Sequence, residues 1–475
     1  MSTHRHHEGV YSPLHLIASD LKTPKSDWRE RTATGRGLRE RLPRSGLGDW
    51  QPGKKRSDPV GLLQAGNAGR DPALIPLRMS RMASSPFAFL RGSAAVMAAD
   101  LATQPSSGLH VMLDGDAHFN NFGLFGTPDA QVVVDLNDFD EVMIGPWEWD
   151  LKRLTASIEV AGREIGLDAP SREHAVRGAS AGYRSAMGLM AGVPVLALWQ
   201  RRTTVEDLIG DLSAQVRGSW AADEGARNLL ESAKKKALQS NNDSLRASMT
   251  QTDASGARVF LEQPPILTRP DAAMRDQVVN ALEAYLHSLP LERRFMMRRY
   301  RVADVSHRVV GVGSVGLRAY CVMLTGNDDT DSLFLQVKQA APAAHAPFAP
   351  SLPEPFNHEG QRVVHGQRLM QSLGDPMLGW TSIDGQPYYV RQMRNLKGSF
   401  APEKMSATTF SAFSWTFGSL LARAHARTGD AAAISGYCGA SSREDHELDD
   451  AMLTWAKAYA DQTEADHARL VASLG

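Results

Sequence analysis

The chain has 475 residues, of which 42% are hydrophobic and 22% are charged, and its formal net charge is −1. This composition is ordinary for a soluble globular protein with more than one core, and the near-neutral charge gives no reason to expect nucleic acid or an anionic membrane as a partner. The two cysteines, Cys321 and Cys438, exclude a disulfide framework. Residues 1–11 lack the apolar segment of a secretory signal, and the best apolar run, residues 186–199, is too short to span a bilayer. We therefore expect a cytoplasmic protein with no membrane insertion.

The first hundred residues divide into a polar segment and an apolar, helical one. Residues 1–75 are rich in Arg, Gly and Pro and are expected to form a loosely structured arm that wraps another part of the protein. From residue 76 the chain is more apolar, and Ser85-Pro86 is a typical helix start. Three arginines lie in or beside this apolar run: Arg78, Arg81 and Arg91. An arginine in such surroundings is usually paired with a carboxylate, and otherwise with a phosphate.

The next stretch, Gly115–Asp140, gathers acidic and amide side chains in two loops around one short predicted strand. A strand over 109–113 leads into a loop with Asp116, His118 and Asn121, and a strand over 131–136 leads into a second loop. The acidic residues of the second strand and loop are Asp135, Asp138 and Asp140. Such groups can hold Mg²⁺ against phosphate oxygens while one carboxylate orients a hydroxyl nucleophile. A surface turn rich in Asp and Asn is the alternative.

Within these loops, each residue type suggests a role. The step of five residues from Asp116 to Asn121 matches loops in which the Asp orients an acceptor hydroxyl and the Asn binds a metal. Asp138 is the preferred second metal ligand and Asp135 the next choice. His118 is expected to be an ordering hydrogen-bond partner, with metal binding as the alternative. A metal-dependent hydrolase built on the aspartates alone remains open.

After the acidic loops the chain alternates between helical and β-rich segments. Gly145-Pro146 predicts a turn. Helices are expected over 149–162, most of 168–250, 271–289, 361–372, 410–428 and after 445, and strands over 317–324, 333–337 and 388–393. The pattern predicts an α+β fold with an arm (1–75), a helical part (76–300), a small β-rich part (301–400) and helices that return to the helical part (401–475).

A glycine-rich run, GVGSVG (311–316), lies between two predicted strands and is followed one strand later by Lys338. Glycines let backbone N–H groups approach phosphates, and a lysine supplies a positive charge. Because the run does not precede a helix, a dinucleotide-binding βαβ unit is disfavoured. The candidate phosphate-binding residues are Gly311, Gly313, Ser314, Gly316 and Lys338, with a flexible hairpin as the alternative.

Ten sequence runs carry a resemblance to a known family: RMASSPFAFLRG (81–92), GDAHFNNFG (115–123), DLNDFDE (135–141), WDLKRL (149–154), GVGSVG (311–316), LQVK (335–338), GQRVV (360–364), GQRLMQ (366–371), YVRQM (389–393) and LARAHAR (421–427). Through these runs nearly the whole chain resembles an uncharacterised bacterial family, domain of unknown function 2252, whose name carries no function.

At a second level, the order GDAHFNN, DFD and WDL is similar to motifs of aminoglycoside phosphotransferases and other protein-kinase-like enzymes, although Asp114 stands where those carry His. The glycine run and Lys338 come after these motifs here and before them in such enzymes, so the resemblance implies a circularly permuted protein-kinase-like bilobal fold. It also implies a Glu that pairs with the Lys from the following helix. His365 stands at the expected position and Gln339 follows the Lys, which leaves Glu359 as a substitute.

The resemblance implies an ATP- and Mg²⁺-dependent phosphotransferase, with Mn²⁺ as a possible replacement metal. Asp116 is then the catalytic residue, Asn121 and Asp138 hold the metal, and the expected partners are a nucleotide and an unknown small-molecule or protein acceptor. The alternatives are transfer of AMP by a nucleotidyltransferase on the same fold, and a non-catalytic nucleotide-binding protein.

Overall fold

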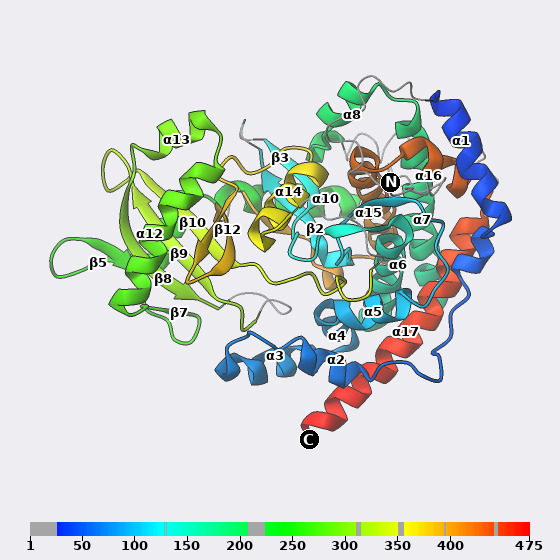
Figure 1. Cartoon of the computed structure of the whole chain (residues 1–475), viewed down its shortest axis with the longest axis horizontal. Helices are drawn as coiled ribbons and strands as arrows, with labels where there is room; N and C mark the ends of the chain where they lie inside the picture. Colours follow the sequence, from blue (N-terminus) through cyan, green and yellow to red (C-terminus); the bar gives the residue numbers. More distant parts are fainter. Residues whose placement is uncertain are drawn as a thin grey trace, which may run out of the picture.

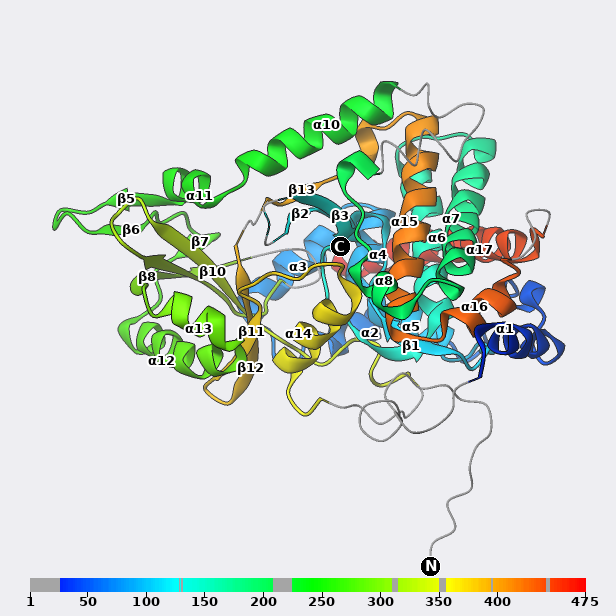
Figure 2. The same ribbon diagram turned by 90° about the horizontal axis from the view of Figure 1, so that it is seen from above.

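The computed structural model describes residues 26–127, 129, 131–207, 224–309, 315–349, 356–393, 396–440 and 445–475. The protein is a mixed α+β fold in which one region is mostly helical and another is built on a six-stranded antiparallel sheet (Figure 1). Figure 2 shows α10 (Glu224–Gln239) running alongside the helical region toward the sheet, where α11 (Asn242–Met249) follows.

The six-stranded sheet has the order β11-β12-β10-β9-β8-β7. Its strands are β7 (Leu267–Thr268), β8 (Arg301–Arg308), β9 (Ala319–Thr325), β10 (Ser332–Gln339), β11 (Gly379–Ile383) and β12 (Gln386–Gln392). Both faces of β9 are buried, because Val322 packs toward α12 (Ala272–Ser288) while Met323 packs against Leu245 of α11 on the other face. This two-sided burial follows the strand period of two and explains why the expected strands were continuous apolar runs.

Helices from both ends of the chain form one bundle. Its members are α6 (Trp147–Glu164), α7 (Ala169–Ala191), α15 (Ala407–Thr428), α16 (Ala431–Cys438) and α17 (Glu447–Leu474). The α7 and α15 backbones approach closely at Gly418, where a Cβ atom would lie only 1.9 Å from the carbonyl oxygen of Ala179. The predicted helices over 149–162 and 410–428 are therefore confirmed, and Figure 1 shows the carboxy-terminal helix beside the earlier ones.

Residues 26–75, expected as a loosely structured arm, contain helices that are fixed to distant parts of the chain. The helices of the first hundred residues are α1 (Trp28–Gly37), α2 (Pro59–Ala65), α3 (Ile75–Met82), α4 (Pro86–Gly92) and α5 (Ala94–Leu101). Arg56 pairs with Asp100 at 2.8 Å and with Asp466 at 2.6 Å, and so ties this segment to α5 and α17. Charge pairs that span the chain are not readable from local composition.

Two short antiparallel ladders bring the acidic loops together. The ladders are formed by β1 (His110–Leu113) with β4 (Met143–Pro146) and by β2 (Phe122–Gly126) with β3 (Val132–Leu136), and β13 (Gly398–Ser399) extends the second. One ladder ends at the pair Leu113 and Met143, the other at Phe122 and Leu136. The loops 114–121 and 137–142 therefore both run between the same two ladders. The turn predicted at Gly145-Pro146 is wrong, because these residues end β4.

The other elements complete the fold. They are β5 (Thr250–Thr252), β6 (Arg258–Phe260), α8 (Val195–Gln200), α13 (Leu291–Met297), α14 (Glu359–Met370), η2 (Leu38–Glu40), η3 (Arg44–Leu47), η4 (Pro72–Leu74), η5 (Phe119–Asn121) and η6 (Pro402–Lys404). In the part of the chain that the structure describes, every helix is too short or too polar to cross a bilayer.

Candidate functional site

The side chain of Asn121 joins the two acidic loops. Its Nδ2 donates hydrogen bonds to the Asp114 carboxylate at 2.7 Å and to the Asp138 carbonyl oxygen at 3.1 Å. Its Oδ1 accepts the backbone N–H of Asp138 at 2.8 Å. Asn121 thus fixes the position of Asp138, and its expected role as a metal ligand stays a prediction.

Asp150, in the first turn of α6, fixes the backbone of the first acidic loop through hydrogen bonds. Its carboxylate accepts the backbone N–H groups of Asp114 at 2.7 Å and Gly115 at 3.0 Å, and it lies 3.0 Å from Nε2 of His425. Gly115 has a φ of +77°, and a Cβ atom there would lie 2.1 Å from the carbonyl oxygen of Glu141. The loop therefore requires glycine at this point, both for its backbone conformation and for the close approach of the second loop.

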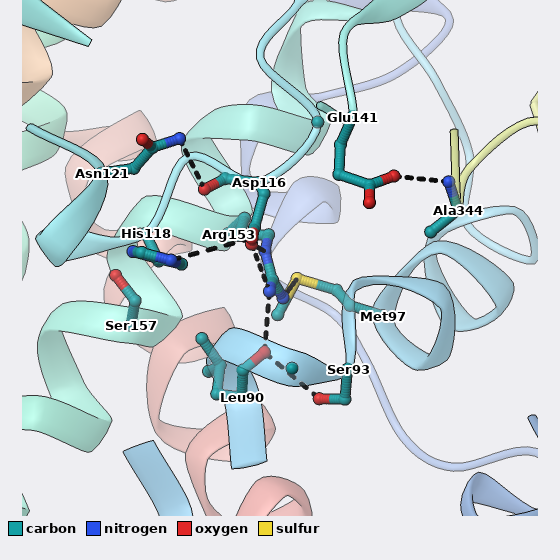
Figure 3. Close-up of polar contacts among 12 residues, drawn as sticks. Leu90, Ser93, Met97, Asp116, His118, Asn121, Glu141, Arg153, Ser157 and Ala344 are labelled. Atoms are coloured by element: carbon teal, nitrogen blue, oxygen red, sulfur yellow. Dashed lines mark hydrogen bonds and ion pairs between the residues drawn. The ribbon is translucent and has the colours of Figure 1, made fainter. Parts of the chain in front are cut away.

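Asp116 lies between an arginine and a histidine, as Figure 3 shows. Nε of Arg153 donates to Oδ1 of Asp116 at 2.7 Å, while Nη2 of Arg153 donates to the Leu90 carbonyl oxygen at 2.7 Å. Nε2 of His118 is 3.7 Å from Oδ2 of Asp116. Burial raises the pKa of Asp116 to about 7 in spite of Arg153. A carboxylate that titrates near neutral pH is suited to general base catalysis.

His118 is neutral at physiological pH. Burial is the largest cause of its strongly lowered pKa, and the positive charges of Arg91 and Arg153 lower it further. Its ring lies against Phe87, with ring centroids 6.4 Å apart. These contacts place a neutral imidazole beside Asp116, and the expected role of His118 as an ordering hydrogen-bond partner stays a prediction.

The second loop presents two aspartates with different surroundings. Asp138 has an exposed side chain that lines a cavity. Asp140 accepts a hydrogen bond from the Tyr389 hydroxyl at 2.9 Å and is paired with Lys338 of β10. Burial raises the pKa of Asp140, but the charge of Lys338 outweighs it and lowers the pKa below its ordinary value. The ion pair keeps both groups charged and joins the sheet to the loop.

The acidic partner of Lys338 is therefore Asp140, whereas Glu359 at the start of α14 is paired with Arg362 at 2.5 Å. Arg362 also donates to the backbone oxygens of Asp140 at 3.0 Å and Ala341 at 2.7 Å. Helix α14 thus contributes an arginine that holds the loop backbone. His365, the residue at the expected acidic position, stacks on Phe356 with centroids 5.5 Å apart.

Asp135 has a structural environment. It is fully buried, is paired with Arg423 of α15, and accepts hydrogen bonds from the backbone N–H and hydroxyl of Ser372, each at 3.0 Å. It does not line the cavity that Asp138 lines. Its contacts fix β3 to α15 and to the end of α14.

The cavity has a volume of about 530 Å³ and collects residues from distant segments. Its charged and amide lining residues are Arg70, Arg78, Arg91, Asp116, His118, Asn120, Asn121, Asn137, Asp138, Asp140, Glu141 and Lys397. Gly311, Gly313 and Ser314 lie outside the described residues. The carbonyl oxygen of Gly316 accepts the N–H of Asp71 at 2.8 Å, and the next residue, Leu317, lines the cavity. The residue after the glycine run therefore lines the same cavity as the acidic loops, whereas Gly316 itself lines a second cavity.

A family profile described as "Uncharacterized protein conserved in bacteria (DUF2252)" matches residues 70–473. The chain belongs to this family. The match spans all of the charged and amide residues that line the cavity, from Arg70 to Lys397. The family resemblance seen in the sequence motifs is thereby confirmed. Searches of curated proteins and of solved structures each found no match.

Several residues that line the cavity or contact its lining residues were not expected as site residues. Arg153 pairs with Asp116, and the carboxylate of Glu141 accepts the backbone N–H of Ala344 at 2.5 Å (Figure 3). Lys397, which is exposed at the cavity, has its pKa lowered to about 7, chiefly by the charge of Arg391 and then by desolvation. Arg153 lies within the family motif WDLKRL (149–154), and this was the signal in the sequence that could have marked it as a site residue.

The acidic loops are suited to a metal that arrives with phosphates. In the described ranges, no three His, Cys, Asp or Glu side chains are arranged as a self-contained metal site. Mg²⁺ usually keeps several waters and binds one or two carboxylates together with substrate phosphates. The exposed carboxylate of Asp138, with Asp140 two residues away on the same cavity wall, fits that mode of binding.

Proposed function

We propose that the protein is an ATP- and Mg²⁺-dependent phosphotransferase that acts on a hydroxyl acceptor. The observation that carries the proposal is the convergence on one cavity of the Asp116 loop, the Asp138 loop and Leu317, the residue after the glycine run, with Lys338 paired to Asp140, which also lines this cavity. A nucleotide in this cavity lies between a β-rich lobe and a helical lobe that both chain ends build. The proposal includes a kinase-like fold in circularly permuted order, which is supported by the position of the acidic loops before Lys338 in the chain.

Each site residue has a role in such a transfer. The acceptor oxygen bonds to the terminal phosphorus of ATP as the bond from that phosphorus to the bridging oxygen breaks, and ADP leaves. Asp116 receives the proton of the acceptor hydroxyl, and Arg153 fixes the direction of its carboxylate. Lys338 and the glycine run attract the phosphates, while Asp138, held by Asn121, is the metal-binding carboxylate with Asp140 beside it. Bound Mg²⁺ supplies positive charge to the phosphate oxygens.

A thermal-shift titration with ATP and Mg²⁺ tests the nucleotide site without knowledge of the acceptor. Binding at 100 times Kd stabilises a protein by about 2.7 kcal/mol. We expect a metal-dependent rise in Tm for the wild type and for the control Asp276→Ala, which removes a largely exposed aspartate of α12. We expect Asp138→Ala to lose the rise. A wild type that shows no shift over a range of metal and nucleotide concentrations refutes the proposal.

The mass of a modified acceptor identifies the group transferred. A candidate acceptor incubated with the protein, ATP and Mg²⁺ is expected to gain one phosphate. A gain of AMP instead identifies nucleotidyl transfer. ATP binding that survives in Asp116→Ala with no product from the wild type identifies a non-catalytic nucleotide-binding protein.

A further inference from the structure

Three arginines form one wall of the cavity: Arg70, Arg78 of α3 and Arg91 of α4. Arg78 is 4% exposed, and its guanidinium donates to the side-chain oxygen of Asn67 at 2.8 Å and to the Gly92 carbonyl oxygen at 3.3 Å. Arg70 donates to two carbonyl oxygens, of Gly66 at 2.9 Å and Val315 at 2.6 Å. These partners are all neutral, so the carboxylate pairing expected for Arg78 is wrong among the described residues.

Two of these arginines have hydrogen-bond donors that are not satisfied by the described residues. The Nε atoms of Arg78 and Arg91 are buried and have no hydrogen-bond partner among the described residues. Burial, and then the charge of Arg70, lower the pKa of Arg78 to about 10, so it is still charged at neutral pH. A buried charge without an opposite charge is costly. The charge of Glu141 raises the pKa of Arg78, but the Glu141 carboxylate itself accepts the Ala344 N–H.

The arginines differ in their positions relative to Asp116. Arg70 contacts Val315 at the end of the glycine run, which is the nucleotide side of the proposed site. The charge of Arg91 lowers the pKa of His118, and Nε2 of His118 is 3.7 Å from Oδ2 of Asp116. Arg78 contacts Gly92, the residue after Arg91. Arg91 therefore lies on the side of His118 and Asp116, where the acceptor hydroxyl must approach, and Arg78 lies next to it at the Gly92 carbonyl, where the charge of Arg70 also acts on it.

We propose that Arg78 and Arg91 bind a phosphate group carried by the acceptor, so that its free hydroxyl lies at Asp116. Phosphate is favoured over a single carboxylate because two guanidinium groups, one buried and one half-buried, are better balanced by a dianion with three acceptor oxygens. This assignment rests on the proposed phosphotransferase function and names its substrate class as a phosphorylated alcohol.

Inorganic phosphate is the probe for this site, with its affinity measured by calorimetry in the absence of nucleotide and metal. We expect the wild type to bind phosphate, and Arg78→Gln and Arg91→Gln to bind it about 10-fold to 100-fold more weakly, as for the loss of a charged hydrogen bond. The matched control is Arg81→Gln, which alters an arginine of the same helix, α3, that does not line the cavity. Circular dichroism checks that each variant is folded, and Arg91, which is only half-buried, tests the site if Arg78→Gln does not fold.

A second titration separates this inference from the proposed function. We expect phosphate to leave the affinity for ATP with Mg²⁺ unchanged, because the two occupy different parts of the cavity. Competition between phosphate and ATP overturns the acceptor assignment, since the arginines then hold nucleotide phosphates. Phosphate affinity that is equal in all variants, or absent in the wild type, also overturns it. If phosphate binds as expected but ATP does not bind at all, the anion site stands and the phosphotransferase function fails.

Discussion

The ammonium group of Lys338 is paired with the carboxylate of Asp140, which lies 198 residues earlier in the chain. Lys338 is 3% exposed and belongs to the six-stranded sheet, whereas Asp140 follows the β2–β3 ladder of the helical region. The pair therefore fixes the loop that carries Asp138 against the sheet. It also holds a lysine ammonium group directly behind Asp140, a carboxylate that lines the cavity where the proposed nucleotide phosphates arrive.

The first prediction concerns the stability that this ion pair confers. Lys338→Met removes the ammonium group that neutralises the Asp140 carboxylate, and breaking a buried pair from one side costs about 3 to 5 kcal/mol. We expect a value near the lower limit, because the Asp140 side chain is 20% exposed. Urea unfolding measures the loss. The double variant Lys338→Met with Asp140→Asn is expected to lose less than the sum of the single changes, and additive losses contradict a direct pair.

The second prediction contrasts two aspartates three residues apart. Asp135→Asn leaves the buried guanidinium of Arg423 without its carboxylate and is expected to lower the free energy of unfolding by about 3 kcal/mol. Asp138→Asn changes an exposed side chain and is expected to stay within about 0.5 kcal/mol of wild type. Binding of ATP with Mg²⁺ is measured under conditions in which both variants are folded. Asp138→Asn is expected to weaken this binding more than Asp135→Asn does. A stable Asp135→Asn variant that cannot bind nucleotide reverses the assignment.

Long, periodic elements of this fold were readable from sequence. Helix α15 and strand β10 have the apolar spacing and the length that local rules detect. Strand β4 was missed because Gly145-Pro146 carries turn signals, yet a two-stranded ladder leaves both strands as edges, where proline is tolerated. Its pairing with β1 depends on the tertiary contacts of the loops between them.

The candidate site was readable only in part, for a similar reason. The spacing of Asp116, Asn121 and Asp138 follows a motif, and the structure brings these residues together. The partners that set their chemistry come from elsewhere: Arg153 from α6 beside Asp116, and Lys338 from the sheet beside Asp140. No local spacing indicates which buried arginine will face which carboxylate.

The third prediction concerns the glycine that lets the two acidic loops touch. Gly115→Ala places a Cβ atom only 2.1 Å from the Glu141 carbonyl oxygen, in addition to backbone strain at a φ of +77°. The matched control is Gly166→Ala, because Gly166 has the same φ of +77° and open space around its Cβ position. The control is expected to cost about 1 kcal/mol from strain alone. Gly115→Ala is expected to cost more in urea unfolding and to weaken ATP binding, and equal costs contradict the close contact.

The fourth prediction follows from the surroundings of Asp116. Its pKa is raised from 3.8 to about 7, chiefly by burial. Between these values the folded protein holds a proton that the unfolded chain has released, so the contribution of Asp116 to stability is complete below pH 3.8 and is lost as the pH rises to about 7. Asp116→Asn lacks this titration. The free energy of unfolding of wild type relative to this variant is therefore expected to fall between pH about 4 and about 7 and to level off above, as measured by urea unfolding.

The same titration predicts the pH dependence of phosphate transfer. The proton of the acceptor hydroxyl can pass only to an ionised carboxylate, so kcat/KM is expected to rise with pH and to reach a plateau above about 7, the pKa of Asp116. Arg153→Lys keeps a positive charge but loses the guanidinium geometry that fixes Oδ1, and is expected to lower kcat more than it changes KM. A profile already flat from pH about 5 upward shows that a group with an ordinary carboxyl pKa, and not Asp116 in this environment, limits the reaction.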